Sequence, residues 1–389
     1  MLVRYSNRKT CGHTPAKKAC GNEKMFDIIQ AHNKTKSTAL QNQLKEKNPL
    51  FLCVIGVTET AKIQGISAAG ANPEITDYTP PADVELLHFG KCKCISGVPV
   101  TPDGIPTPAL ITMSALKLAD IPTLVVNAGL KVKPHVPFVE LGGSPGRDIR
   151  TGNALDNAEE VLNKAKVAGE NLGKTADYLV IGESIPGGTT TAFSVLLAMG
   201  VDAKRKISSS MPVNPHDLKI KTVEAALKAA EVEAGEFADE PIMAVSSVGD
   251  PMQPALAGLV LGATKHVPVI MAGGTQMAAV LAVVNASNPN VLENVSIGTT
   301  RWIVSDKTAD LKALIAEIAD VPVLAADLDF SNSKFDGLKA YEAGIVKEGV
   351  GCGGASIAAM LKTNGKVTKN VLLKEIENNY KQLVGSANM

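Results

Sequence analysis

The sequence is poor in aromatic residues and has no excess of charge of either sign. Phe, Trp and Tyr make up 4% of its 389 residues, and there is a single Trp. Lys and Arg together number 39, as do Asp and Glu, so the formal net charge is zero. Proteins that bind nucleic acid need a basic field, and single-strand binders also need aromatic side chains on which bases stack. We therefore expect small-molecule substrates as partners, and no nucleic acid.

Long hydrophobic runs are also missing. The apolar runs are as short as strands and are interrupted by Gly or Pro, whereas a membrane-spanning helix needs about 20 apolar residues. Residues 1–4 lead at once into polar sequence, which is unlike the apolar core of a signal peptide. The six cysteines are then expected to be reduced thiols. These absences predict a cytoplasmic protein with no membrane partner.

Spacing typical of metal ligands is absent as well. Cys11, His13 and Cys20 lie close together near the N-terminus, but no fourth ligand follows at the spacing of a zinc site. The other histidines are scattered along the chain. We expect no metal site.

Short apolar runs recur through the middle of the chain, and each is followed by Gly, Asn, Asp or Ser and then by a helical pattern. Continuous apolar strands that alternate with amphipathic helices are typical of a parallel sheet covered on both faces. The sequence therefore predicts an α/β fold with a doubly wound, mostly parallel sheet. The expected strands lie at 51–55, 84–89, 123–126, 178–181, 242–245, 267–271, 302–304 and 321–324.

The domain organisation is predicted from changes in this pattern. Residues 1–22 are rich in Lys and Arg without apolar periodicity, which indicates a basic N-terminal arm. Residues 48–330 carry the expected strands and form a large α/β domain. Residues 23–47 read as polar and helix-like, and strand signals fade after 330. We expect 23–47 and 331–389 to form a smaller, mainly helical lobe.

A glycine-rich loop follows the expected strand at 178–181. Glycines let backbone amides approach an anion, and a helix N-terminus adds about half a positive charge. No Lys follows the last glycine, so the loop is not a triphosphate-binding P-loop, and a monophosphate suits it better. The alternative is a helix capped by Thr189 after a tight turn. The loop reads Gly182-Glu183-Ser184-Ile185-Pro186-Gly187-Gly188-Thr189-Thr190, with the helix expected to start at the threonines.

Two carboxylates stand beside glycine-rich segments. Glu183 would repel a phosphate, so we expect it to face a sugar or a base instead. Glu348 precedes Gly349-Val350-Gly351-Cys352-Gly353-Gly354, whose spacing formally matches a dinucleotide-binding fingerprint. Residues 338–346 before it look helical, however, and too little chain follows for a second βαβ unit. A carboxylate beside a loop without side-chain bulk suits a general base that touches a planar ligand, although a solvent-facing Glu is the alternative.

These segments resemble the nicotinate-nucleotide:dimethylbenzimidazole phosphoribosyltransferase family. Residues 182–190 stand where the family reads G-E-M-G-I-G-N-T-T, and residues 347–352 where it reads G-E-G-T-G-A. Residues 219–227 and 255–263 match its helices K-I-x-x-I-x-x-A-L and A-L-A-G-x-x-L-G-A. Four motifs stand in the same order. Departures such as Pro186 in the first loop point to a divergent, archaeal-type branch.

The resemblance implies a reaction. Family members transfer phosphoribosyl from nicotinate mononucleotide, a co-substrate, to a benzimidazole-type base, which gives an α-ribazole 5′-phosphate and nicotinate for the lower loop of cobalamin. No cofactor is implied. Because family members form homodimers, a homodimer is expected here.

The resemblance also implies roles for individual residues. Glu348 would be the general base, and Glu183 a second carboxylate at the base pocket. The phosphate and ribose would be bound by Gly182, Gly187, Gly188, Thr189, Thr190, Lys219, Gly349 and Gly351. The base pocket would include Pro106, Thr107 and Pro108.

Two other functions stay open. The first is a nucleotide-binding protein without turnover, which would have no need of a base such as Glu348. The second is another phosphoribosyl enzyme, such as a phosphorolytic nucleosidase. That chemistry brings free phosphate to C1′ and needs a basic pair near Glu348, for which Lys347 is the one nearby residue in the sequence.

Overall fold

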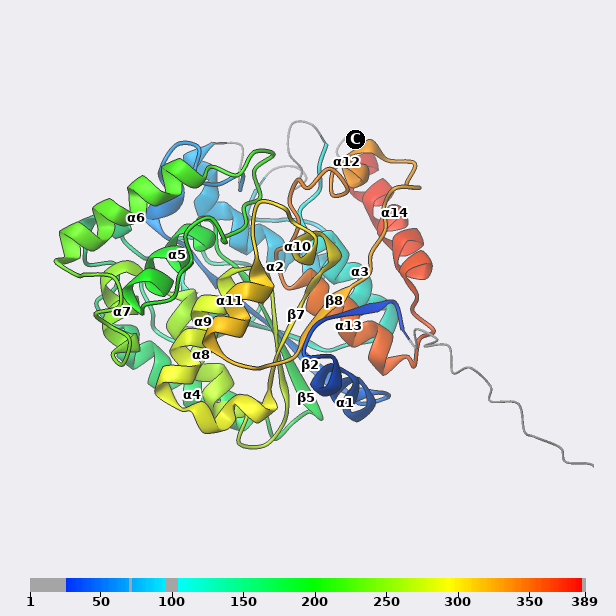
Figure 1. Cartoon of the computed structure of the whole chain (residues 1–389). Helices are drawn as coiled ribbons and strands as arrows, with labels where there is room; N and C mark the ends of the chain where they lie inside the picture. The colour runs from blue at the N-terminus through cyan, green and yellow to red at the C-terminus, as the bar shows by residue number, and fades with distance from the viewer. Residues whose placement is uncertain (1–25, 70–71, 96–103, 387–389) are drawn as a thin grey trace, which may run out of the picture.

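The computed structural model describes residues 26–69, 72–95 and 104–386 (Figure 1). Within them, eight strands form one sheet in the order β1-β8-β7-β6-β5-β2-β3-β4. All neighbours are parallel except β1, which pairs antiparallel with β8 at one edge. The predicted doubly wound, mostly parallel α/β fold is confirmed. The strands are β1 (Ile28–His32), β2 (Pro49–Gly56), β3 (Thr123–Gly129), β4 (Phe138–Glu140), β5 (Tyr178–Ser184), β6 (Val269–Ala272), β7 (Val295–Thr300) and β8 (Val323–Ala326).

Helices cover both faces of the sheet (Figure 1). Those in the described residues are α1 (Lys34–Leu44), α2 (Thr79–Phe89), α3 (Ala109–Ala119), α4 (Ala158–Leu172), α5 (Gly188–Ala198), α6 (His216–Ala230), α7 (Pro241–Val248), α8 (Met252–Ala263), α9 (Gln276–Ser287), α10 (Arg301–Val304), α11 (Leu311–Ile318), α12 (Asp336–Lys339), α13 (Cys352–Lys362) and α14 (Lys369–Ser386). Helices α4 to α9 and α11 pack on one face, and α1, α2, α3, α13 and α14 on the other.

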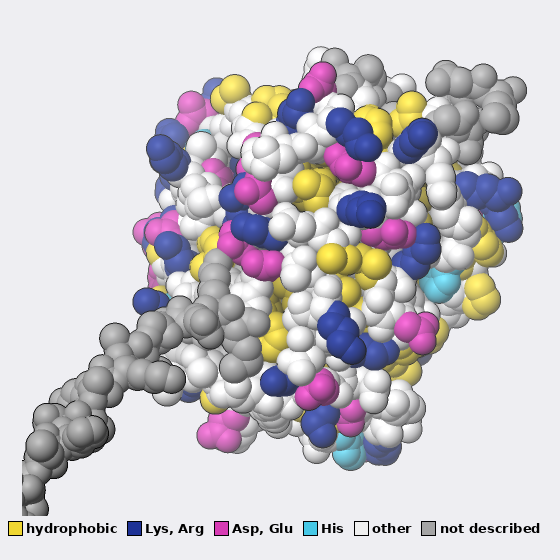
Figure 2. Space-filling model, turned by 90° about the vertical axis from the view of Figure 1, so that its right-hand side faces the viewer, with side chains coloured by type: hydrophobic (Ala, Val, Ile, Leu, Met, Phe, Trp, Pro, Cys, Tyr) yellow, Lys and Arg dark blue, Asp and Glu magenta, His cyan; other side chains and the backbone are white. Residues whose placement is uncertain are grey.

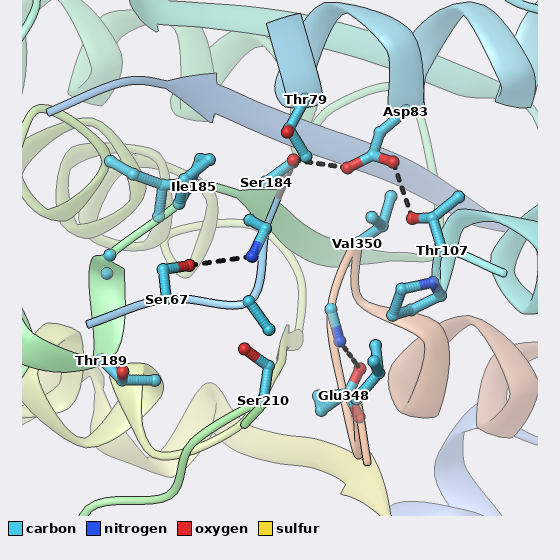
Figure 3. Close-up of a pocket in the computed structure, with 18 of the residues that line it drawn as sticks. Ser67, Thr79, Asp83, Thr107, Ser184, Ile185, Thr189, Ser210, Glu348 and Val350 are labelled. Atoms are coloured by element: carbon cyan, nitrogen blue, oxygen red, sulfur yellow. Dashed lines mark hydrogen bonds between the residues drawn. The ribbon is translucent and has the colours of Figure 1, made fainter. Parts of the chain in front are cut away.

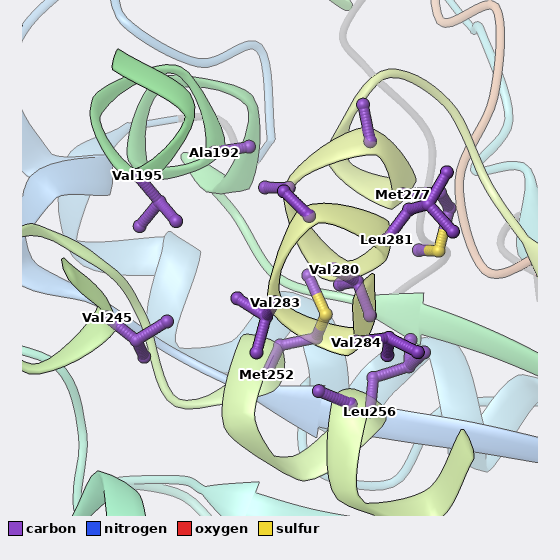
Figure 4. Close-up of a cluster of buried hydrophobic side chains, with 14 of the residues drawn as sticks. Ala192, Val195, Val245, Met252, Leu256, Met277, Val280, Leu281, Val283 and Val284 are labelled. Atoms are coloured by element: carbon purple, nitrogen blue, oxygen red, sulfur yellow. The ribbon is translucent and has the colours of Figure 1, made fainter. Parts of the chain in front are cut away.

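A hydrophobic core lies between the sheet and the helices on each face, and strand β2 contributes side chains to both cores. Leu52 and Val54 point into the core beneath α4 to α9, whereas Phe51, Cys53 and Ile55 point into the core on the other face. Successive side chains of a strand alternate between faces, so a strand buried on both sides reads as a continuous apolar run. Figure 4 shows part of the first core, where side chains of α5, α7, α8 and α9 meet.

Three of the eight expected strands are helices instead. Residues 84–89 lie in α2, 242–245 in α7 and 302–304 in α10. Both α2 and α7 carry a Pro in the first turn, a position that favours a helix start. Their apolar residues are buried helix faces, which a short apolar run does not distinguish from a buried strand. The remaining expected strands, at 51–55, 123–126, 178–181, 267–271 and 321–324, correspond to β2, β3, β5, β6 and β8.

The segment 23–47 contains a helix as predicted, α1, but strand β1, which was not expected, precedes it. This strand pairs with β8 from Ile28 opposite Ala326, so it belongs to the same sheet as the strands of 48–330. Helix α13, from the other part of the predicted lobe, packs on that sheet as well. The division into a large domain and a small lobe stays a prediction. The basic arm 1–22, with Cys11, His13 and Cys20, lies outside the described residues.

The strand order reverses between β2 and β5. From β2 the chain continues outward to β3 and β4, and from β5 it continues the other way to β6, β7 and β8. At this reversal Ile55 pairs with Ser184 near the carboxyl ends of the two strands. Ligands of open parallel sheets bind in the crevice outside the carboxyl ends of strands at such a switch point. The glycine-rich loop after β5 starts there.

Basic and acidic side chains are interspersed over the face shown in Figure 2. None of the helices in the described residues has the length and apolar character needed to cross a membrane.

Candidate active site

A pocket of about 580 Å³ opens at the switch point (Figure 3). Its volume falls within the range of about 300–1,000 Å³ that is usual for small-molecule sites. The wall is formed by segments far apart in the sequence, among them the start of α2, the loop before α3, the β5–α5 loop and residues 346–350. The two glycine-rich segments singled out in the sequence therefore meet at one cavity.

Nine of the thirteen predicted site residues line this pocket. The pocket-lining residues are Pro106, Thr107, Pro108, Glu183, Gly187, Gly188, Thr189, Glu348 and Gly349. Gly182, Thr190, Lys219 and Gly351 are not part of its lining. The structure thus brings together both carboxylates, the glycine-rich loop after β5 and the expected base pocket. The other four predicted residues lie behind the pocket wall.

Gly182 and Gly351 have a structural role that explains why they lie behind the wall. A Cβ on Gly182 would stand 2.9 Å from the Gly351 Cα, and a Cβ on Gly351 would stand 2.8 Å from the Gly182 Cα. Real Cβ atoms do not come so close to backbone, so this crossing of β5 by the start of α13 requires a glycine on both segments. The residues hold the two loops together rather than facing a ligand.

Hydrogen bonds to and from the backbone of Val350 fix the segment around Glu348. The amide of Val350 donates to the Glu183 carbonyl oxygen at 2.9 Å, and the hydroxyl of Thr112 donates to the Val350 carbonyl oxygen at 2.9 Å. Val346 and Val350 both have left-handed φ, 58° and 53°. Such values are strained for β-branched residues, and strain of this kind clusters at functional sites. The segment that carries Glu348 is therefore held in an unusual conformation by its neighbours.

The two oxygens of the Glu348 carboxylate have different hydrogen-bond partners. Its Oε1 accepts hydrogen bonds from the amides of Gly349 (3.1 Å) and Gly353 (3.2 Å) and from the Cys352 thiol (3.1 Å). Its Oε2 accepts a longer one from the Thr299 hydroxyl (3.5 Å). Burial raises the pKa of Glu348 to about 7, and the donors on Oε1 oppose that rise. A carboxylate with a pKa near the working pH is suited to general-base catalysis.

Glu183 lies in a different environment from Glu348. It is buried, with 3% of its surface exposed, and its Oε1 accepts a hydrogen bond from Gln276 Nε2 at 3.1 Å. Burial raises its pKa well above the ordinary value, and the nearby carboxylates of Asp250 and Glu348 raise it further. Burial and the neighbouring carboxylates therefore favour the protonated form of Glu183. Paired carboxyl groups whose environments separate their pKa values commonly divide acid and base roles.

Helix α5, which follows the glycine-rich loop after β5, begins one residue earlier than expected. Gly187 is the N-cap, with φ 79°, and the helix starts at Gly188 without a side-chain cap, so capping by Thr189 is not observed. The Gly188 amide already donates to the Ile185 carbonyl oxygen (3.2 Å), and the Thr190 amide to that of Gly187 (2.9 Å). The positive end of the α5 dipole still faces the pocket.

Lys219 lies directly behind this loop. It is 1% exposed, and its Nζ donates to Thr189 Oγ1 at 2.9 Å and to the Ser208 carbonyl oxygen at 2.6 Å. Burial lowers the pKa of Lys219 to about 7; Lys347 lowers it too, whereas Asp306 acts in the opposite direction. Lys347 itself pairs with Asp306 at 2.8 Å. The structure therefore places a buried amine behind Thr189, where its protonated form can strengthen the field at the loop.

Several pocket residues were not predicted from the sequence. Gln276 and Lys347 line the pocket, as do Asp83 and Ser184, whose hydroxyl donates to Asp83 at 2.7 Å. Asp83 was hidden by the expectation of a strand at 84–89. Pro in the first turn of α2 was the signal that could have revealed a helix there and turned Asp83 toward the switch point. For Gln276 no local pattern marks the position, and Lys347 was named only as the basic residue next to Glu348.

Comparisons with known proteins agree with this site. The family model described as "Phosphoribosyltransferase" matches residues 113–329. A UPF0284 protein of Sulfolobus acidocaldarius is 46% identical over 338 residues, which is 87% of this chain and 96% of that protein. A UPF0284 protein of Archaeoglobus fulgidus is 47% identical over 344 residues, covering 88% and 96% of the two chains.

Solved structures share the fold at low sequence identity. The crystal structure of CobT from Thermus thermophilus has a TM-score of 0.54 and 17% identity, over 84% of this chain and 88% of that one. A structure of nicotinate-nucleotide-dimethylbenzimidazole phosphoribosyltransferase from the same organism also gives 0.54, with 16% identity, over 86% and 92%. The predicted family resemblance is confirmed. Because its family model spans more than half of the chain, the protein belongs to the phosphoribosyltransferase family.

Proposed function

We propose that this protein transfers the phosphoribosyl group of nicotinate mononucleotide to a benzimidazole-type base. The products are an α-ribazole 5′-phosphate, used for the lower loop of cobalamin, and nicotinate. One observation carries the proposal: Glu348 and the Gly187–Thr189 loop line the same pocket of about 580 Å³. The loop at the start of α5 suits a monophosphate, and Glu348 suits the removal of a proton from an aromatic base.

The proposed reaction is a single displacement at C1′ of the ribose. The bond from C1′ to the pyridinium nitrogen breaks, and its electron pair leaves with nicotinate as a neutral ring nitrogen. An azole nitrogen attacks C1′ from the opposite face, which inverts a β-linkage to an α-linkage. The proton on the other azole nitrogen passes to Glu348. Holding both planar reactants in contact supplies much of the remaining acceleration.

The two carboxyl groups take different parts in this mechanism. The ionised Glu348 accepts the proton and stabilises positive charge that develops on the base and the sugar. Burial raises the pKa of Glu183, and in its protonated form Glu183 adds no second negative charge and can donate a hydrogen bond to a ribose oxygen. Gln276 holds Glu183 in place through its Oε1.

The rival functions fit the site less well. A phosphorolytic nucleosidase needs free basic groups beside Glu348, but Lys347 is paired with Asp306 and Lys219 is bonded to Thr189 and Ser208. A protein that only binds a nucleotide needs no carboxylate with a pKa near 7 in the pocket. Both points favour transfer.

The test is incubation with nicotinate mononucleotide, with and without 5,6-dimethylbenzimidazole, while free nicotinate and the new nucleotide are measured by chromatography and mass spectrometry. Transfer predicts that nicotinate is released in step with the new nucleotide and only when the azole is present. Release without the azole would indicate hydrolysis. Binding of the nucleotide without any release would indicate a non-catalytic protein.

The proposed reaction uses nicotinate mononucleotide as its co-substrate and requires no metal ion or other cofactor, so treatment with a chelator is expected to leave the rate unchanged. Among the residues that the structure describes, no group of three or more His, Cys, Asp or Glu side chains is arranged to hold a metal ion. From the family resemblance we also propose that the protein is cytoplasmic and forms a homodimer. Sedimentation equilibrium of the purified protein tests the homodimer.

A further inference from the structure

Three polar side chains meet at the part of the pocket formed by α2, the end of β5 and the loop before α3 (Figure 3). Asp83, on α2, is buried with 3% of its surface exposed. Its Oδ1 accepts a hydrogen bond from the Thr107 hydroxyl at 2.7 Å, and its Oδ2 accepts one from the Ser184 hydroxyl at 2.7 Å. All three residues line the pocket. We call them the Asp83 cluster.

The hydrogen-bond directions in the Asp83 cluster are fixed by charge. Burial raises the pKa of Asp83 to about 6 and the two hydroxyl donors oppose the rise, so the group is ionised above pH 7. An ionised carboxylate only accepts hydrogen bonds, and a hydroxyl has one proton to donate. Ser184 and Thr107 each give that proton to Asp83. What they offer to a ligand is therefore oxygen lone pairs, of which Thr107 Oγ1 already uses one to accept from the Ala109 amide at 3.3 Å.

The cluster lies at a defined place relative to the reacting groups. In Figure 3, Asp83 and Thr107 stand across the pocket from Thr189 of the phosphate loop, with Glu348 on a third side. The loop that carries Thr107 packs on the Glu348 segment, since a Cβ on Gly349 would be 3.1 Å from Pro108 Cγ. A base that meets Glu348 through its azole ring thus has its other ring beside the Asp83 cluster.

Resting on the proposed function, we propose that the accepted base carries a hydrogen-bond donor, a hydroxyl or amino group, on its six-membered ring, and that Ser184 and Thr107 accept this hydrogen bond. A ring that carries only methyl groups would leave the remaining lone pairs of these two oxygens unused and shielded from water, which is costly. Sites built to hydrogen-bond a substrate group reject analogues without that group far more strongly than apolar pockets reject an added one. Asp83 acts through the two hydroxyls and is a positioning residue.

The experiment compares benzimidazoles that differ at one ring position. An amino and a methyl substituent have similar size, but the amino group donates hydrogen bonds and the methyl group does not. Dissociation constants of 5-aminobenzimidazole, 5-hydroxybenzimidazole and 5-methylbenzimidazole are measured by calorimetry at pH 8 in the presence of nicotinate. We expect the two donors to bind at least about tenfold more tightly than the methyl compound. Equal affinities, or a preference for methyl, would overturn the proposal.

Variants of its three residues test whether the Asp83 cluster causes the preference for donor-bearing bases. Thr107→Val removes a hydroxyl without changing shape, and Ser184→Ala removes the other; each is expected to bring the amino-to-methyl ratio towards one. Asp83→Asn places an amide donor against one hydroxyl, frees that hydroxyl to donate, and is expected to shift the preference towards 5-methoxybenzimidazole, an acceptor. Ser67→Ala removes a different pocket hydroxyl, which accepts from the Ala69 amide, and is expected to keep the ratio. An unchanged ratio in Thr107→Val and Ser184→Ala contradicts the proposal, even if Asp83→Asn fails to fold.

Failure of this inference can be told apart from failure of the proposed function. Transfer of phosphoribosyl to unsubstituted benzimidazole without any preference for donor-bearing bases overturns the inference alone. A binding preference for donors without transfer to any base overturns the proposed function and supports the role of the Asp83 cluster.

Discussion

The backbone amide of Val350 donates a hydrogen bond of 2.9 Å to the carbonyl oxygen of Glu183. This bond joins the end of strand β5, which carries Glu183, to the segment that carries Glu348, although the two lie far apart in the chain. The segments that carry Glu183 and Glu348 are therefore fixed to one another through backbone. Four predictions about this arrangement can be measured.

Replacing Glu348 by Gln is expected to leave folding and nucleotide binding intact and to lower kcat by about 10²- to 10⁴-fold, because an amide cannot accept the proton. Steady-state kinetics and a thermal melt measure the two effects. Glu159→Gln, on the exposed surface of α4, is the matched control and should retain the rate. Full activity in Glu348→Gln would remove this residue from the base role.

The pH dependence of kcat/KM is expected to follow the ionisation of Glu348. The base must be ionised, and its pKa is raised to about 7, so the rate should rise with pH below about 7 and level off above it. The Cys352 thiol stabilises the ionised form, so Cys352→Ala should move the rising limb to higher pH, while Cys352→Ser keeps a donor and should not. A limb near 4.5, the ordinary pKa of a glutamate, in the unmodified protein would contradict this assignment.

Binding of a phosphate monoester is expected to be accompanied by proton uptake at Lys219. Its pKa is lowered to about 7 in the free protein, so at pH 8 the amine is mostly neutral, and a bound anion beside Thr189 raises that pKa again. Calorimetry with ribose 5-phosphate in buffers of different ionisation enthalpy measures the uptake. Lys219→Met should abolish it and weaken binding, because the variant places no positive charge behind Thr189. Uptake that persists in Lys219→Met would assign it to another group.

Gly182→Ala is expected to destabilise the protein by about 1–3 kcal/mol, because the added methyl group meets the Gly351 backbone in a packed interior. Displacement of the Glu348 segment should also lower activity. Gly344→Ala offers a comparison, since nothing lies within 4 Å of a Cβ added at Gly344. Its φ of 79° is left-handed, which costs an alanine about 1–2 kcal/mol. Denaturant unfolding measures both variants. Loss of activity in Gly344→Ala equal to that in Gly182→Ala would argue against a specific effect of the crossing.

The parts of the fold that the sequence predicted are those with local signals. Strands such as β2 and β5 are buried on both faces and read as continuous apolar runs. Strand β7 was missed because its sequence, VSIGTT, contains Ser, Gly and Thr. In α2 and α7 the apolar run was mistaken for a strand although Pro stands in the first turn.

The candidate site was predictable to the extent that its residues belong to contiguous motifs. Glu183, Glu348 and the Gly187–Thr189 loop are such residues, and all of them line the pocket. The Asp83 cluster depends on three separate elements meeting, and this is decided by packing rather than by spacing along the chain. Lys219 was expected at the phosphate, but its position behind Thr189, with no direct place in the pocket wall, follows from the way α6 packs against α5.

The backbone crossing at Gly182 and Gly351 lets two properties of this protein vary independently: the spacing of the two active-site segments and the choice of the base. Since main chain meets main chain there, the spacing between the backbone of β5 and that of the Glu348 segment does not depend on any rotamer. Substitutions on the α2 side of the pocket can alter which acceptor fits, while the reach of the transfer stays the same. Under the proposed function, acceptor choice is thus free to change without a change in the spacing of these two segments.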